Sequence, residues 1–371
     1  MSERRPRVAM VTPYFLPHNG GVEQHVAEVA RRINASGAAE VTVLTTGAED
    51  GLAERETVSG TEVRRFHARP RGRDWLWCPE IGRTLRDEPW DLVHVQSYHT
   101  LVAPAAMVTA ARHNIPYVVT FHGGGHSSAL RTRVRGLQRR LLGPLLRRAD
   151  RLVAVAGFEI DDYGAELHVP RERFALIPNG FDLPDPGEPA ATDPGTLIAS
   201  IGRLERYKGH QHVIAALPHV LEAVPEARLW IAGAGPYEHE LRDQAQRLGV
   251  SARVSIEAVA AGDRAEMARR VAAADAVVLM SSYETHPVAA LEAIALGRPV
   301  LVAPGSGFGE LAAKGLARTC DPEPPEQLAA EIVRVVNEPF TPASAELPDW
   351  DACAAGLAAL YREVLERRCA S

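Results

Sequence analysis

The sequence predicts an α/β protein built from two Rossmann-like domains that face each other across a cleft. Two observations lead to this class. Short apolar segments rich in Val, Ile and Leu alternate with segments of helical periodicity along nearly the whole chain. A segment dense in Pro, Gly and Asp, residues 181–195, divides this alternation into two halves of comparable size. A cleft between two such domains is a usual place for a ligand.

The 371 residues are enough for two domains of ordinary size. We expect an N-terminal domain at 1–183, a linker at 184–195, a C-terminal domain at 196–348 and a closing segment at 349–371. In the first half, strands are expected at 8–11, 41–45, 63–66, 92–95, 117–121, 152–156 and 174–177, with helices near 22–34, 101–113 and 131–151. In the second half, strands are expected at 197–201, 229–232, 253–256, 276–280 and 299–302. Helical patterns there cover about 211–223, 237–248, 264–273, 287–296 and 325–337, and a last amphipathic helix covers about 351–367.

Composition excludes several classes of protein. Apolar residues make up 46% of the chain and charged residues 24%, which is typical of a globular protein. No apolar run approaches the length of about 18 residues that a membrane span needs, and the start passes directly into a strand, unlike a signal peptide. The four cysteines form no Cys-x-x-Cys pair, which favours a reduced, cytoplasmic protein without a structural zinc site. A net charge of −6 without interleaved aromatic and basic residues argues against nucleic-acid binding.

One candidate anion site is the segment 202–209, Gly-Arg-Leu-Glu-Arg-Tyr-Lys-Gly, between a strand and a helix. Arg203 offers a planar fork for phosphate oxygens, and Lys208 offers a compact positive charge. Glycines at both ends let the backbone bend close to a ligand, and the helix N-terminus follows. These features predict a diphosphate site; a solvated basic turn is the alternative.

A second candidate lies at 274–302, which reads as strand, loop, helix and strand. Glu284 is in the loop and Glu292 is one helix-length away. Eight helical residues rise about 12 Å, too far for the two carboxylates to share one bond-breaking step. Two separate hydroxyl-binding roles at the ends of an extended ligand fit this spacing. The alternative is a charged loop and an unrelated, satisfied helix glutamate.

Two further features could bind ligands, and each has a structural alternative. His122 follows a strand and precedes three glycines, and Gly20-Gly21 precedes a helix whose amides could face an anion. The helix at 131–151 carries eight arginines and could lie on an anionic membrane surface, face an acidic acceptor or simply be solvated.

The sequence shows no metal-binding motif. The one Asp-x-Asp, at 349–351, does not follow a strand, and no cluster of His, Asp or Glu has metal-ligand spacing. A nicotinamide-type glycine fingerprint is absent.

Five segments, in this order, resemble signatures of the retaining family-four glycosyltransferases, also described as glycosyl transferases group 1. They are GGVE at 20–23, RADRLVAVA at 148–156 with IPNGFD at 177–182, GRLERYKG at 202–209, YETHPVAALEAIALGRPV at 283–300 and DWDACAAGLAALYREVL at 349–365. The resemblance covers nearly the whole chain. It implies a GT-B fold, in which the closing helix at 349–371 returns to the N-terminal domain.

The resemblance also implies roles for the candidate residues. The catalytic group would be His122, Arg203, Lys208 and Glu284; the donor-binding group would be Gly21, Arg203, Lys208, Glu284, Thr285, His286, Pro287 and Glu292; the acceptor side would be Gly20, Gly21, Glu23 and His122. Arg203 and Lys208 would neutralise the diphosphate leaving group, so that no metal or other cofactor is expected. Glu284 would hold donor-sugar hydroxyls and Glu292 the ribose hydroxyls.

The implied activity is transfer of a sugar, with retention of anomeric configuration, from a nucleotide-diphosphate-sugar to a hydroxyl of a small-molecule, natural-product or cell-envelope acceptor. A UDP-sugar is favoured over a GDP-sugar. In the family the glutamate is usually followed by Gly-Phe-Gly; here Thr285-His286-Pro287 follows Glu284, which leaves the identity of the donor sugar open. The alternatives are a nucleotide-sugar 2-epimerase of the same architecture and a non-catalytic nucleotide-sugar-binding relative.

Overall fold

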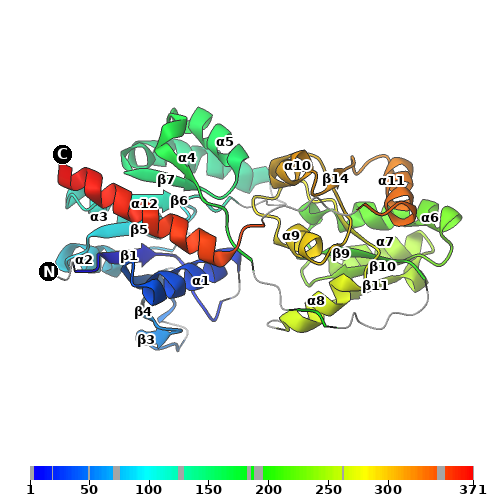
Figure 1. Ribbon diagram of the computed structural model, residues 1–371, viewed down its shortest axis with the longest axis horizontal. Helices are drawn as coiled ribbons and strands as arrows, with labels where there is room; N and C mark the ends of the chain where they lie inside the picture. Colours follow the sequence, from blue (N-terminus) through cyan, green and yellow to red (C-terminus); the bar gives the residue numbers. More distant parts are fainter. Residues whose placement is uncertain are drawn as a thin grey trace. The chain divides into compact units, whose positions relative to one another are not determined.

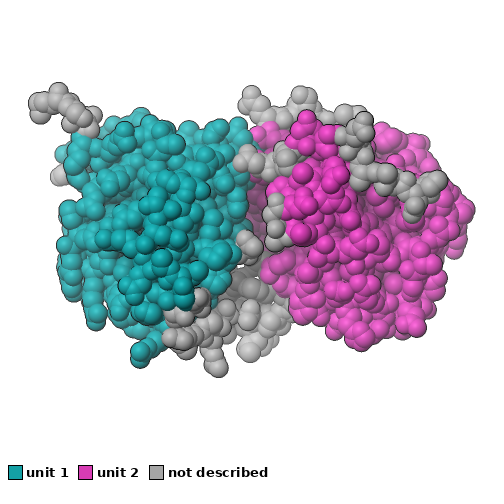
Figure 2. Space-filling model, turned by 90° about the horizontal axis from the view of Figure 1, so that it is seen from below, with its two compact units in different colours: residues 1–123, 128–180, 348–371 teal, residues 124–127, 181–347 magenta. Residues whose placement is uncertain are grey.

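The computed structural model describes residues 4–18, 20–48, 51–69, 76–123, 129–181, 185–187, 195–260, 263–340 and 347–370, with the side chains of 129–137 and 139 excepted. The chain divides into two compact units, coloured separately in Figure 2. Unit 1 comprises residues 1–123, 128–180 and 348–371, and unit 2 comprises residues 124–127 and 181–347. Each unit contains one sheet of mainly parallel strands, so the predicted α/β class is confirmed. Most of the predicted linker at 184–195 lies outside the described residues.

Unit 1 holds an eight-stranded sheet in the order β3-β4-β2-β1-β5-β6-β7-β8. Its strands are β1 (Arg7–Val11), β2 (Glu40–Thr46), β3 (Arg55–Val58), β4 (Thr61–Phe66), β5 (Leu92–Gln96), β6 (Tyr117–Thr120), β7 (Arg151–Ala154) and β8 (Phe174–Leu176). Among the described strands of this sheet, β3 pairs with β4 in the antiparallel direction and the other neighbouring strands pair in parallel. The sequence pattern did not predict β3, because this edge strand has alternating exposed and half-buried residues and no apolar run.

Helices cover both faces of this sheet (Figure 1). One face packs on α2 (Pro79–Asp87), α3 (Val102–Arg112), α4 (Ala129–Arg148) and α5 (Gly157–Leu167). The other packs on α1 (Gly21–Ser36) and on α12 (Trp350–Ala370), the red helix that lies beside α1 in Figure 1. The end of the chain therefore supplies part of the core of unit 1.

The Arg-rich helix ends earlier than the sequence pattern predicts. We expected it over 131–151, but α4 stops at Arg148 and Arg151 already belongs to β7. The reason is Asp150, whose carboxylate accepts a hydrogen bond from the Tyr117 amide while its own amide donates to the Tyr117 carbonyl. These two bonds start the pairing of the strands. Leu141 of α4 is 70% exposed.

Unit 2 holds a six-stranded parallel sheet in the order β11-β10-β9-β12-β13-β14. Its strands are β9 (Leu197–Ile201), β10 (Arg228–Ala232), β11 (Val254–Glu257), β12 (Ala276–Leu279), β13 (Val300–Val302) and β14 (Arg318–Thr319). The helices are α6 (His210–Ala223), α7 (Glu238–Arg247), α8 (Arg264–Ala272), α9 (Val288–Ala295), α10 (Ser306–Ala313) and α11 (Pro325–Asn337). The sequence pattern missed α10 and the two-residue strand β14. Among the described residues, short 3-10 turns cover Arg206–Lys208 and Ser251–Arg253 in unit 2 and Arg171–Arg173 in unit 1.

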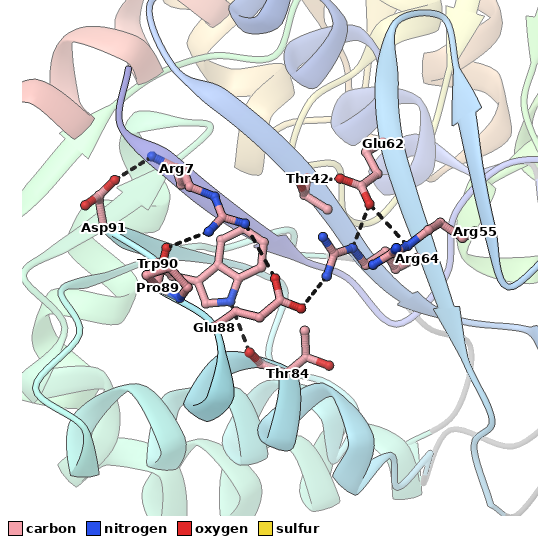
Figure 3. A network of polar contacts seen from close by, with 10 residues as sticks. All are labelled: Arg7, Thr42, Arg55, Glu62, Arg64, Thr84, Glu88, Pro89, Trp90 and Asp91. Carbon is pink, nitrogen blue, oxygen red and sulfur yellow. Dashed lines mark hydrogen bonds and ion pairs between the residues drawn. The ribbon is translucent and has the colours of Figure 1, made fainter. Parts of the chain in front are cut away.

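Hydrogen bonds and ion pairs of charged side chains connect the amino ends of strands in unit 1 (Figure 3). The Arg7 amide donates to Asp91 at 2.7 Å, and Arg64 donates to Glu62 at 2.8 Å and to Glu88. The Arg7 guanidinium lies 4.8 Å from the centre of the Trp90 ring. This network joins β1 and β4 to the segment that leads into β5, at the edge of the sheet opposite to the strands' carboxyl ends. We assign it a structural role.

The Asp-x-Asp at 349–351, which does not follow a strand, also has a structural role. The carboxylate of Asp349 accepts a hydrogen bond from the Ala352 amide at 2.6 Å and so caps α12. Asp351 forms an ion pair with Arg32 of α1 at 2.6 Å. Among the described residues, no group of three or more His, Cys, Asp or Glu side chains is placed to hold a metal ion. None of the described helices is both long enough and apolar enough to cross a membrane.

Candidate functional site

The predicted site residues fall into two groups, one in each unit. Unit 1 holds Gly20, Gly21, Glu23 and His122; unit 2 holds Arg203, Lys208, Glu284, Thr285, His286, Pro287 and Glu292. The residues of each group lie in the loops that follow the carboxyl ends of parallel strands, or on the helix that comes next. Open α/β sheets bind ligands at these strand ends.

In unit 2 the structure brings the two predicted loops together. Strand β9 pairs with β12, so the loop that follows each strand emerges at the same edge of the sheet. The Lys208 ammonium forms a short ion pair with the carboxylate of Glu284. Both side chains are 16% exposed, so this pair is largely shielded from water. A single positive charge thus lies against the carboxylate expected to hold sugar hydroxyls.

Arg203 belongs to the same loop but is far more exposed. Its guanidinium pairs with Glu205 at 2.6 Å and donates to the Tyr207 hydroxyl at 2.7 Å. The Tyr207 ring lies close to both cations, with its centre 5.3 Å from Lys208 Nζ and 6.0 Å from Arg203 Cζ. The sequence pattern alone does not mark Tyr207 as a site residue. Its place between Arg203 and Lys208 in the loop is the signal that could have identified it.

Close backbone contacts fix these loops. Gly209 has φ of +77°, and a Cβ atom there would lie 1.9 Å from the Met280 carbonyl oxygen. The Ser282 amide donates to the Tyr207 carbonyl at 2.8 Å. On the other side, the Glu284 amide donates to Ser306 Oγ at 3.1 Å, and the Gly307 amide donates to the Glu284 carbonyl at 2.8 Å. The backbone of Glu284 is therefore held between the loops that follow β9 and β13.

The two glutamates have different partners. Glu292, on α9, is buried and forms an ion pair with Arg264 of α8. Burial raises the pKa of its carboxyl group, and Arg264 opposes this shift. Glu284 and Glu292 therefore have separate cationic partners, Lys208 and Arg264. Arg264 was not recognised from the sequence, in which nothing connects it with Glu292.

The segment Thr285-His286-Pro287, where the sequence departs from the usual family pattern (hereafter the departure segment), is mostly buried. Thr285 is 8% exposed, and its carbonyl oxygen would lie 2.6 Å from a Cβ at Gly307. Burial lowers the pKa of His286 to about 4, and its Nε2 has no hydrogen-bond partner among the described residues. Pro287 caps α9 instead of opening its first turn as expected, and its carbonyl accepts hydrogen bonds from the Ala290 and Leu291 amides.

A buried histidine that the sequence pattern does not mark as a site residue, His210, begins α6 directly after the Arg203 loop. His210 is 1% exposed and its Nδ1 is 2.9 Å from Ser200 Oγ. Burial, together with the nearby charge of Lys208, lowers the pKa of His210 to about 4. The imidazole is therefore neutral at physiological pH and adds no charge behind Arg203 and Lys208.

In unit 1, the N-terminus of α1 carries the predicted glycines. Gly20 is the N-cap, and a Cβ atom there would lie 2.2 Å from Glu23 Oε2. The Glu23 carboxylate therefore folds back over the first turn of its own helix, and burial raises its pKa. A Cβ at Gly21, by contrast, would meet nothing within 4 Å. Of the two glycines, Gly21 is the one with open space beside it.

His122 follows β6 and is 9% exposed. Its Nε2 is 2.7 Å from Gln96 Oε1, at the end of the neighbouring strand β5. The ring of His25 lies edge-on, 4.8 Å away between ring centres. The Glu159 carboxylate accepts hydrogen bonds from the amides of Gly123, at 3.3 Å, and Val155, at 2.9 Å. The sequence pattern does not mark three of these neighbours as site residues: Gln96, His25 and Glu159. The clearest available signal is Gln96, a polar residue at the end of the apolar strand β5.

Two family models match the chain. Glycosyltransferase Family 4 matches residues 19–184, and Glycosyl transferases group 1 matches residues 185–347. The glycogen synthase of Mycobacterium tuberculosis is 30% identical, over 90% of this chain and 86% of the relative. The D-inositol 3-phosphate glycosyltransferase of Nocardiopsis dassonvillei is 31% identical, over 86% of this chain and 82% of the relative. A GDP-mannose:cellobiosyl-diphosphopolyprenol alpha-mannosyltransferase of Xanthomonas oryzae is 28% identical, over 78% and 77%.

Solved structures share the fold at lower identity. Sucrose-phosphate synthase from Thermosynechococcus elongatus superposes with a TM-score of 0.76 at 18% identity, covering 98% of this chain and all of that one. Anabaena HepE in complex with UDP-glucose superposes with a TM-score of 0.68 at 20% identity, again covering 98% of this chain and all of that one. The predicted resemblance is therefore confirmed. The chain belongs to the glycosyl transferases group 1 and is a glycosyltransferase with the GT-B fold.

Proposed function

We propose that the protein is a retaining glycosyltransferase that moves a hexose from a nucleotide-diphosphate-sugar to an acceptor hydroxyl without a metal ion. The observation that carries this proposal is the contact between the loops after β9 and β12, in which Lys208 forms an ion pair with Glu284. Arg203 lies in the same loop as Lys208. A cation beside a carboxylate suits a ligand in which a diphosphate adjoins a polyhydroxylated sugar.

In the proposed reaction the bond between the anomeric carbon and the diphosphate oxygen breaks, and the leaving diphosphate keeps the electron pair. The acceptor oxygen forms the new bond on the same face of the sugar, and its proton passes to the leaving phosphate oxygen. Lys208 and Arg203 stabilise the charge that develops on the diphosphate, in the position where other enzymes use a metal ion. Glu284 holds donor-sugar hydroxyls, Glu292 holds ribose hydroxyls, and His122 acts at the donor sugar.

A UDP-sugar is the preferred donor in this proposal, with UDP-glucose as the first to test. HepE, which shares the fold, was crystallised with UDP-glucose, whereas the Xanthomonas oryzae relative is named for GDP-mannose. The acceptor is a small molecule, a natural product or a cell-envelope precursor. Membrane contact through 131–151 stays a prediction, because the side chains of 129–137 and 139 lie outside the described residues.

The test begins with thermal unfolding in the presence of UDP, GDP and ADP, each with magnesium and with EDTA. A nucleotide at one hundred times its Kd should stabilise the fold by about 2.7 kcal/mol. We expect UDP to give the largest shift and EDTA to leave it unchanged. Stabilisation by none of the three would contradict the donor site, and stabilisation only with magnesium would contradict metal independence.

Turnover is then measured with UDP-glucose and a panel of hydroxylated acceptors. We expect slow donor hydrolysis alone, faster consumption with the right acceptor, and a product whose anomeric proton coupling shows retention. Conversion of the donor sugar without any acceptor would instead identify a 2-epimerase. An inverted product would contradict the proposed stereochemistry.

A further inference from the structure

Strand β5 carries two polar side chains in an otherwise apolar, fully buried run. The strand reads Leu-Val-His-Val-Gln, so His94 and Gln96 occupy alternate positions and face the same side of the sheet. Both side chains belong to residues with 0% exposure. That side of the sheet is covered by α1 and α12, because Leu92 packs in the same apolar cluster as residues of both helices.

These side chains form a continuous series of polar contacts within unit 1. It starts on α12, where the Tyr361 hydroxyl is 2.6 Å from His94 Nδ1. His94 Nε2 is 2.7 Å from Thr120 Oγ1 of β6. The amide nitrogen of Gln96 lies 3.3 Å and 3.2 Å from the two ring nitrogens of His94. The amide oxygen of Gln96 is 2.7 Å from His122 Nε2.

The direction of the last bond determines the tautomer of His122. A side-chain amide oxygen can only accept a hydrogen bond, so Nε2 of His122 must carry the proton. In the neutral ring, Nδ1 is then the acceptor nitrogen.

The rest of the series is neutral and rigid. Burial lowers the pKa of His94 to about 3 and raises the pKa of Tyr361. Neither group changes charge near neutral pH, which suits a positioning role better than proton transfer. Buried polar groups that satisfy one another also resist rotation, because any rotated arrangement would leave a donor or acceptor unpaired.

We propose that Gln96 is a positioning residue that holds His122 in its Nε2–H tautomer, and that Tyr361 and His94 hold Gln96 in place from the C-terminal helix. The functional part of this inference rests on the proposed role of His122 at the donor sugar. It assigns α12 a role in the site: the last helix of the chain supplies the hydroxyl from which the series of contacts begins.

The test compares Gln96→Leu, which removes the acceptor, with Gln96→Glu, which keeps an acceptor and adds a charge. Histidine is labelled with 15N, and the His122 signal is identified by its loss in His122→Ala. We expect the Nε2–H tautomer in the unmodified protein and a mixture of tautomers in Gln96→Leu. In Gln96→Glu the Nε2–H form should persist, and the titration midpoint of His122 should rise, because the added carboxylate favours the imidazolium.

With donor and acceptor, Gln96→Leu should lower kcat on the order of ten- to a hundredfold, while the donor KM changes less than about threefold. Tyr361→Phe should lower kcat by a smaller factor. Tyr117→Phe is the matched control, because it removes another buried hydroxyl of unit 1, bonded to the Leu145 carbonyl and not to this series. Thermal unfolding of each variant identifies any that fail to fold.

An unchanged tautomer of His122 in Gln96→Leu would overturn the positioning role. Equal losses of kcat in Tyr361→Phe and Tyr117→Phe would overturn the link to α12, since the effect would then be one of stability alone. If His122→Ala keeps full turnover, the proposed role of His122 in transfer is wrong. The 15N signals would still decide whether Gln96 sets its tautomer, so the two failures can be told apart.

Discussion

The candidate site residues of the two units are held by opposite physical means. In unit 1, His122 is fixed by neutral, buried hydrogen-bonding groups that come from strands and a helix. In unit 2, Lys208 and Glu284 are charged, lie on loops and neutralise each other. A buried neutral network keeps one arrangement, whereas an ion pair on loops can exchange its partners for a charged ligand. The contrast suggests that unit 1 supplies a fixed contact and unit 2 supplies charges that respond to the donor.

The largest effect should come from removing the charge in unit 2. Lys208→Ala should lower kcat on the order of 100- to 1000-fold with the nucleotide-sugar donor, because one positive group at a developing anion contributes that much. Lys314→Ala is the matched control: Lys314 follows α10 and is exposed, so its loss should leave turnover unchanged. Turnover of Lys208→Ala within threefold of the unmodified protein would contradict the assigned role.

The next largest effect tests how the loops of unit 2 are held. Gly209→Ala should destabilise the protein by about 3 kcal/mol or more, because the new Cβ would lie 1.9 Å from the Met280 carbonyl oxygen at a positive φ. Gly249→Ala has a similar φ of +71° but open space around the new Cβ, so it should cost only about 1 kcal/mol. Urea unfolding measures both. If Gly209→Ala and Gly249→Ala lose equal amounts of unfolding free energy, then backbone strain, and not the close approach of the loops, sets the requirement for glycine at position 209.

A pH experiment asks whether unit 2 also depends on a buried neutral group. The pKa of His210 is about 4 in the folded protein, below its ordinary value of 6.5. Its contribution to stability is therefore present above pH 6.5 and is lost as the pH falls toward 4, by about 3 kcal/mol in total. In His210→Gln the decline in unfolding free energy between pH 7 and pH 4 should be smaller by that amount. His239 is exposed, with a side chain that is 86% accessible, and serves as the control. The unfolding free energy of His239→Gln should decline between pH 7 and pH 4 like that of the unmodified protein.

The smallest effect concerns His286 in the departure segment. Because its buried Nε2 has no partner among the described residues, His286→Leu should keep or slightly raise the thermal stability. If Nε2 meets the donor sugar, the same variant should raise the donor KM about tenfold, equivalent to about 1.4 kcal/mol. An unchanged donor KM would exclude His286 from sugar recognition. Lower stability with unchanged KM would assign His286 to packing alone.

Much of the site was visible in the sequence as motifs. Arg203 and Lys208 follow a predicted strand with glycines on either side, and the spacing of Glu284 and Glu292 was readable as a helix-length separation. His94 and Gln96 were also visible, as polar residues at alternate positions of an apolar strand, but alternation alone does not say what they face. The error at α4 arose because the arginines continue past the helix end, and the hydrogen bonds of Asp150 to Tyr117 cannot be read from local sequence.

The sequence by itself determined the alternation of strands and helices, the glycines at the sharp turns and the charges available for chemistry, because these depend on local periodicity and residue type. Only the tertiary structure decided which charges and dipoles meet. Lys208 reaches Glu284 because β9 pairs with β12, and Gln96 reaches His122 because β5 pairs with β6. Tyr361 reaches His94 across 267 positions of the chain because α12 packs on the face of β5 that carries His94. Strand order and helix placement are set by the packing of whole faces, and no short stretch of sequence records them.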